Sequence, residues 1–173
     1  MAVTVDLTWK DTWPLYTVFP VTTICFTAFY FAGPRIWPRT RIGDKYSKWS
    51  ELTRKCWRQN VNAFIHSVVS TVLCVAAIAS DPEMRNGDRL GSHHNVLGYT
   101  SLSFSLGYFS FTIPWTYYLY FVKGERRATN LALVIHHGVV WASCFTYLIG
   151  RTCALYGAAA FACMEFSNWC AGA

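Results

Sequence analysis

The fold is decided by residues 61–80, which read VNAFIHSVVSTVLCVAAIAS and contain one histidine and no formal charge. A bilayer core of about 30 Å is crossed by roughly 20 residues of helix, which is the length of this stretch. A surface helix of a soluble protein would present a charged or polar face at helical spacing, and this stretch has no charged face. Residues 61–80 are therefore predicted to be a transmembrane helix.

Apolar runs of similar length lie before and after this stretch. They cover residues 13–33, 96–122, 128–149 and 152–169, of which the last is the shortest and is marginal for a crossing. Pro34 and Pro38 follow the first run and are expected to end it, because proline breaks a continuing helix. The chain is therefore predicted to be all-α, a polytopic transmembrane helical bundle with about five membrane spans.

The overall composition supports a membrane protein. The chain is 53% hydrophobic and 17% aromatic, and its mean hydropathy is +0.23. Only 14% of the residues are charged, against roughly a quarter in a soluble domain. A soluble helical bundle, the alternative, would need charged outer faces that these runs lack. The composition therefore favours burial in lipid.

The net charge of +6 is concentrated between the first two spans. Residues 34–59 contain eight basic side chains, and the short connection at 123–127 is also basic, whereas the second connection mixes both signs. By the positive-inside rule, residues 34–59 form a basic cytosolic loop and residues 1–12 lie outside or in a lumen. The loop is expected to touch anionic lipid head groups. No nucleic-acid module surrounds it, so nucleic acid is not expected as a partner.

Ionisable groups occur inside three of the predicted spans: His66, the pair His136–His137, and Glu165. Such groups are costly at bilayer depth and usually face the interior of a bundle. At 1.5 Å per residue, His66 lies roughly 9 Å from the cytosolic end of its span, and the histidine pair roughly 12–15 Å. Thr112 lies at a similar depth. These depths predict a single polar cavity that faces the cytosol.

Nearby polar residues extend this set. Asn62 shares a helix face with His66 at i, i+4, and Asn168 neighbours Glu165 at i, i+3. Structural roles stay open, because His66 can hydrogen-bond another helix and Glu165 can pair with a histidine. The cysteines show no CxxC and no metal-type spacing, so neither a metal site nor a cofactor is expected.

Short motifs in the last four spans resemble the TLC-domain family of multi-pass membrane proteins, which includes the ceramide synthases and smaller regulators of lipid composition. The motifs are WRQN at 57–60 with HSVVS at 66–70, GYF at 107–109, the pair His136–His137, and EFSN at 165–168. The resemblance implies a partial TLC domain at 60–169, followed by a short tail at 170–173. With Tyr108 of the GYF motif, the lipid-binding candidates are Asn62, His66, Tyr108, Thr112, His136, His137, Glu165 and Asn168.

Within that family, the segment from WR at 57–58 to HSVVS at 66–70 and the segment DPEM at 81–84 are most similar to the small regulators. The ceramide synthases use the paired histidines and downstream acidic residues to transfer an acyl group from acyl-CoA. Here EFSN replaces their Asp-containing cluster, and Thr112 stands where the family commonly has Asp. The family domain normally continues with further spans, so the resemblance implies that the chain is truncated at its C-terminus.

The resemblance implies that the protein influences membrane phospholipid composition, fluidity and lipid homeostasis by binding a lipid or acyl chain in the cavity. It implies membrane lipids and other membrane proteins as partners, and the plasma membrane as location, with the endoplasmic reticulum as the alternative. Two further functions stay open. One is an acyltransferase that uses acyl-CoA as substrate, with His136, His137 or Glu165 as catalytic residues. The other is a helical regulator of a membrane channel or transporter.

Overall fold

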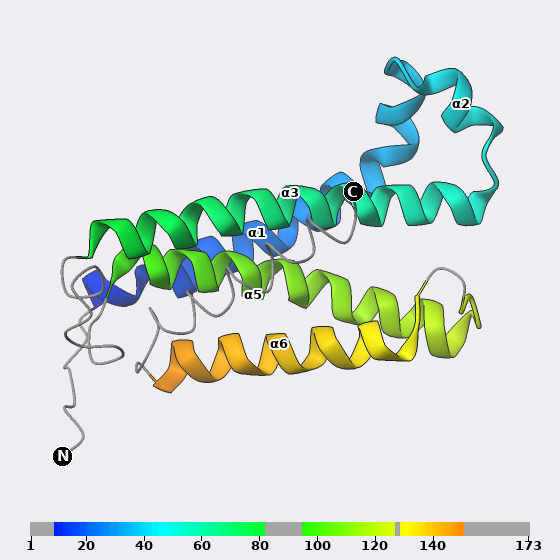
Figure 1. The fold of residues 1–173 in the computed structure, drawn as a ribbon. Coiled ribbons are helices and arrows are strands. Elements are labelled where there is room, and N and C mark those ends of the chain that lie inside the picture. Colours follow the sequence, from blue (N-terminus) through cyan, green and yellow to red (C-terminus); the bar gives the residue numbers. More distant parts are fainter. Residues whose placement is uncertain (1–8, 82–94, 127–128, 151–173) are drawn as a thin grey trace.

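The computed structural model describes residues 9–81, 95–126 and 129–150, which form helices and loops and no strand. Four long helices in this part of the chain lie side by side (Figure 1): α1 (Trp9–Ile36), α3 (Glu51–Ser80), α5 (Val96–Tyr117) and α6 (Leu131–Gly150). The 3-10 turn η1 (Trp37–Arg39) and the short helix α2 (Gly43–Lys48) connect α1 to α3, and the π-helical turn η2 (Tyr118–Val122) continues α5. The all-α bundle predicted from the sequence is confirmed.

Helix α5 is the central helix of this bundle, because α1, α3 and α6 all pack against it. Its buried side chains form most of the core, together with Phe26 and Tyr30 of α1 and Val140, Cys144 and Leu148 of α6. The members contributed by α5 are Tyr99, Leu102, Leu106, Tyr108, Phe109 and Phe111. Large aromatic rings thus fill the space between the helices.

The bundle is apolar on its outside and polar at its helix contacts. Ile24, Phe64 and Val139 are each at least 60% exposed, whereas Asn62 and Ser101 are fully buried. A water-soluble protein shows the opposite distribution. In a bilayer, polar and small side chains instead pack between helices, and apolar ones face the lipid chains. This distribution identifies an integral membrane protein.

Three of the described helices are long and apolar enough to cross a membrane, over Thr12–Arg39, Glu51–Ser80 and Leu131–Ile149. The serines, threonines and tyrosines of α5 lower its hydropathy, and most of them are buried in the bundle. The number of crossings therefore stays a prediction. The predicted outward segment at 1–12 is described only from residue 9, and the fifth span at 152–169 and the tail at 170–173 lie outside the described residues.

Of the two prolines expected to end the first run, Pro34 lies inside α1, which continues to Ile36, and Pro38 lies just beyond the end of this helix in η1. Pro34 lacks the N–H that would normally bond the carbonyl of Tyr30. Arg58 supplies a donor instead, since its Nη1 lies 3.4 Å from the Tyr30 oxygen and its guanidinium lies 4.6 Å from the centroid of the Tyr30 ring. Gly33 leaves room for this contact, because a Cβ there would overlap the Arg58 side chain. A contact from α3 thus stabilises the last turn of α1.

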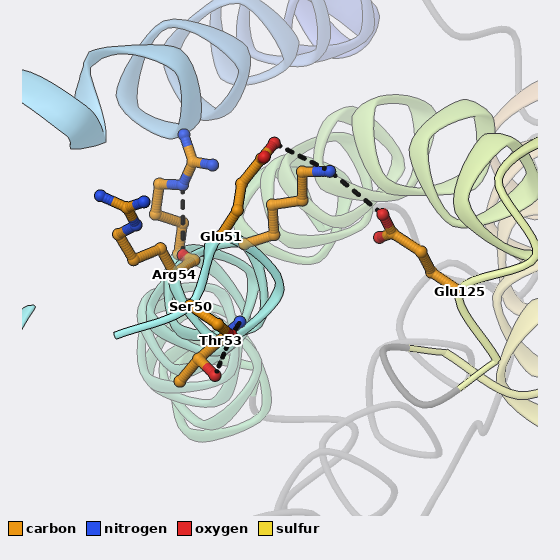
Figure 2. Close-up of polar contacts among 7 residues, drawn as sticks. Ser50, Glu51, Thr53, Arg54 and Glu125 are labelled. Carbon is orange, nitrogen blue, oxygen red and sulfur yellow. Dashed lines mark hydrogen bonds and ion pairs between the residues drawn. The ribbon is translucent and has the colours of Figure 1, made fainter. Parts of the chain in front are cut away.

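The basic segment predicted as a loop at 34–59 is largely helical. It contains η1, α2 and the first turns of α3, which begins ten residues before the predicted span. Ser50 caps α3, because its Oγ accepts a hydrogen bond from the Thr53 N–H at 3.2 Å (Figure 2). In the same way, Asn130 accepts the Leu133 N–H at 2.7 Å, and α6 begins at Leu131. Capping residues rather than apolar runs decide where these helices start.

Candidate functional site

The site is built on two polar stripes, one on α3 and one on α5, that face each other. Their members recur at helical spacing, so each stripe lies on one side of its helix. All are buried: Asn62, His66, Ser70 and Cys74 on α3, and Ser101, Ser105, Tyr108 and Thr112 on α5. The two stripes place the polar groups of both helices inside the bundle.

Hydrogen bonds join these stripes in antiparallel order. The Sγ of Cys74 lies 2.9 Å from the Oγ of Ser101, which also donates to the Ser70 carbonyl at 3.5 Å. Nearer the middle of α3, the Nε2 of His66 lies 3.2 Å from the Oγ of Ser105. Small side chains at these positions let the helices approach closely, and interhelical bonds of this kind contribute about 0.6 kcal/mol each on average.

His66 is surrounded by aromatic rings. Its imidazole stacks on Tyr108, with ring centroids 4.1 Å apart, and lies parallel to Phe104 at 5.8 Å. The edges of Phe109 and Phe26 approach at centroid distances of 5.3 and 6.5 Å. These contacts hold the ring plane of His66 in one orientation.

The histidine pair of α6 reaches the same aromatic residues from the other side. His137 is buried and His136 is half-buried, and their ring centroids are 5.8 Å apart. The ring of His137 lies 5.3 Å from Phe109 and 6.5 Å from Tyr108. Both aromatic residues also contact His66, so α5 links the histidines of α3 to those of α6.

These residues surround a cavity of about 190 Å³. Its lining comes from three helices and combines three imidazoles, two hydroxyl groups and apolar side chains. The lining residues are Ala63, His66, Ser67, Tyr108, Phe109, Leu133, His136 and His137. The Nδ1 of His137 is buried and has no hydrogen-bond partner among the described residues. A buried polar atom of this kind favours a polar ligand or water.

The remaining candidates lie elsewhere. Asn62 and Thr112 are buried but do not line this cavity. Asn62 instead donates through Nδ2 to the carbonyl of Phe26 at 3.2 Å, which ties α3 to α1. Glu165 and Asn168 lie outside the described residues. Their place in the site stays a prediction.

The sequence reasoning missed three residues next to His66, which are Ser105, Phe104 and Phe26. A signal for Ser105 exists, because it precedes Tyr108 by three residues and therefore shares its helix face. No local pattern distinguishes the two phenylalanines from the other apolar residues of their helices. Their proximity to His66 follows only from how the helices pack.

The cavity can form hydrogen bonds with a polar group. A neutral imidazole carries one donor and one acceptor nitrogen, and hydroxyl groups can do both. Adjacent imidazoles are also suited to general-base or nucleophilic chemistry on an activated acyl group. Within the described part of the chain, no three His, Cys, Asp or Glu residues gather as metal ligands would.

Comparison with known families accounts for this arrangement. The family model of the TLC domain (TRAM_LAG1_CLN8) matches residues 56–172, about two thirds of the chain. The chain belongs to the TLC-domain family. The match includes α5, α6 and most of α3, so all the helices that line the cavity belong to the TLC domain, whereas α1 precedes it. Searches of the curated proteins and of the solved structures found no significant match to this TLC-domain protein.

Proposed function

We propose that this TLC-domain protein influences membrane phospholipid composition and fluidity by binding a lipid in the cavity between α3, α5 and α6. The observation that supports the proposal is the convergence of His66, His136 and His137 on one cavity inside a bundle with an apolar outside. Polar groups buried at bilayer depth commonly mark a functional site. The imidazoles would contact the polar head of the lipid, and the apolar helix surfaces its chains.

The size of the cavity limits what it can hold. A volume of about 190 Å³ corresponds to about six water molecules, at roughly 30 Å³ each in the liquid. This is enough for a small polar head group and too little for a complete phospholipid. The acyl chains would therefore lie outside the cavity, along the apolar faces of the helices.

The proposal also concerns location and partners. We expect the protein in the plasma membrane, with the endoplasmic reticulum as the alternative, and with its N-terminus outside. Membrane lipids would be its main partners, and other membrane proteins would be a second class of partner. The basic segment at 34–59 would then face the cytosol, as the positive-inside rule requires.

Phospholipid and sphingolipid profiling by mass spectrometry tests the proposal. Cells would express the wild-type protein, the double variant His136→Ala/His137→Ala, or no protein. A matched control is Ser143→Ala/Thr146→Ala, because both hydroxyl groups are exposed on α6 and bond only carbonyls of their own helix. We expect the wild type and the control to change phospholipid acyl composition equally, and the histidine variant to lose the change.

Two other outcomes would favour the competing functions. A rise in ceramides that depends on the histidines would indicate acyl transfer from acyl-CoA, with one imidazole as nucleophile or base and the thiol of CoA as leaving group. The side-by-side placement of His136 and His137 on the cavity favours this second candidate. An unchanged lipid effect in the histidine variant would contradict the cavity proposal and favour a helical regulator of another membrane protein.

A further inference from the structure

An apolar groove runs between α1 and α3, on the side of the bundle away from α6. It has a volume of about 590 Å³ and is lined mainly by side chains of α1. Its α1 residues extend from Val21 to Ile36, about 22 Å at 1.5 Å per residue. One leaflet of the bilayer core is about 15 Å thick, half of roughly 30 Å. The groove is thus long enough to accommodate an acyl chain along the full depth of one leaflet.

A basic pocket lies at the Ile36 end of this groove. It has a volume of about 260 Å³ and is lined by Pro34 and Pro38 and by the side chains of Tyr46, Ser47, Glu51, Arg54 and Arg58. On α3, Arg54 and Arg58 share a helix face with Ile65 and Val69, which line the groove. The stem of Arg58 packs on α1 at Gly33, whose chain neighbours Ala32 and Pro34 line the groove and the pocket respectively. Groove and pocket therefore follow one another along the same pair of helices.

The charges of the pocket favour an anion. Arg58 uses two of its five N–H groups, on the carbonyls of Arg54 and Tyr30, and the other three have no hydrogen-bond partner among the described residues. The guanidinium of Arg54 has no ion pair or hydrogen bond among the described residues. Like charges at i, i+4 repel each other, so the two guanidinium groups oppose one another unless an anion lies between them.

The acidic residue of the pocket, Glu51, contacts a lysine that does not line the pocket. Glu51 pairs with the Nζ of Lys55 at 3.3 Å, and Lys55 also contacts Glu125 at 3.2 Å. Figure 2 shows this chain of contacts, with Glu125 on the opposite side of α3 from Arg54. The carboxylate of Glu51 thus lies next to Lys55, and with two arginines against one glutamate the pocket keeps a net positive charge.

The pocket also lies in the most basic part of the chain. Residues 34–59 contain eight basic and two acidic side chains, a net charge of six, which equals the net charge of the whole chain. The rest of the chain is therefore neutral. Concentrated basic charge next to a membrane span attracts anionic lipids.

We propose that the groove and the basic pocket together bind one anionic glycerophospholipid of the leaflet at the basic end of the bundle. One acyl chain lies in the groove between α1 and α3, and the phosphate lies between Arg54 and Arg58. This site is distinct from the cavity of the three histidines, although Phe26 and Phe104 of the groove pack against His66. It uses none of them and does not depend on the proposed function.

Lipid retention tests this site directly. The full chain is reconstituted in nanodiscs of phosphatidylcholine with a minor fraction of phosphatidylserine and then extracted in mild detergent. Native mass spectrometry identifies the retained lipid. We expect the wild type to retain phosphatidylserine preferentially, and Arg54→Gln to lower its retention about fivefold. Ala32→Leu narrows the groove and should also lower retention.

Matched controls separate a specific site from general effects. Arg39→Gln removes the same charge from the same segment but outside the pocket, and Ala142→Leu adds the same volume on an exposed face of α6. Both should retain phosphatidylserine as the wild type does. Retention that depends on Arg54 is also measured in the His136→Ala/His137→Ala background, so that lipid held in the histidine cavity is not counted. A thermal melt of each variant checks folding; Arg58→Gln is avoided because Arg58 also stabilises α1.

Two results would overturn the proposal. Equal losses of phosphatidylserine in Arg54→Gln and Arg39→Gln would mean that the segment attracts anionic lipid only diffusely. The second result is that soluble glycerophosphoserine displaces phosphatidylserine while Ala32→Leu retains it unchanged. This would mean that the pocket binds an anion and that the groove binds no acyl chain.

Discussion

The imidazole of His66 lies face to face on the phenol ring of Tyr108, with ring centroids 4.1 Å apart and an interplanar angle of 10°. The two side chains come from α3 and α5, are almost completely buried, and line the same cavity. His66 is therefore both a packing element between two helices and a polar group of the candidate site. Substitutions can separate these two roles.

Removal of the His66 ring should destabilise the bundle much more than removal of its hydrogen bond. His66→Ala leaves a void among four aromatic rings and should cost about 2–5 kcal/mol. Ser105→Ala removes only the interhelical hydrogen bond and should cost about 0.6–1 kcal/mol. Thermal unfolding in detergent measures both. Equal losses for the two variants would show that the stacking contributes nothing to stability.

Substitution by alanine should change the stability in opposite directions at two glycines. A Cβ on Gly107 of α5 would lie 2.7 Å from the Phe19 carbonyl oxygen and from the Cβ of Thr22, so Gly107→Ala should force α1 and α5 apart and cost about 1–3 kcal/mol. A Cβ on Gly138 of α6 would meet no atom of the described residues within 4 Å. Gly138→Ala should be neutral or stabilise the helix by up to about 1 kcal/mol. The same melts measure this pair, and a stable Gly107→Ala would contradict the close packing of α1 on α5.

The ion pair between Lys55 and Glu125 should contribute modestly to stability and be sensitive to salt. Both side chains are mostly shielded, at 16% and 25% exposure, whereas Glu51 on the other side of Lys55 is 77% exposed. Glu125→Gln should therefore cost up to about 1 kcal/mol, and Glu51→Gln close to nothing. High salt should reduce the cost of Glu125→Gln, because ions screen such pairs. A cost that does not change with salt would argue against the ion pair.

The predicted topology places the N-terminus outside and α2 in the cytosol. An epitope fused before Met1 should bind antibody on intact cells if the protein is in the plasma membrane. An epitope inserted next to exposed Lys48 should bind antibody only after the membrane is permeabilised. Labelling of the second epitope on intact cells would show that the protein has the opposite orientation.

The architecture could be predicted largely from the sequence, because it depends on local properties. Whether a segment prefers lipid to water depends on its own length and composition, as at 61–80. The motifs around His66, Tyr108 and His136 likewise indicate the TLC domain by their order along the chain, and the family match covers them. Helix ends were less predictable, because they depend on single side chains such as Ser50 and Asn130.

Only the tertiary structure decided which polar side chains meet. Successive residues of a helix point about 100° apart, so a small rotation of α3 or α5 would exchange the members of the site. The sequence placed Asn62 and Thr112 with the histidines, but both lie outside the cavity, and Ser105 holds His66 instead. The close approach of α1 to α5 at Gly107 restricts the rotation of α5. Apolar composition therefore determined that the chain enters a membrane as helices, and packing between those helices determined which side chains form its site.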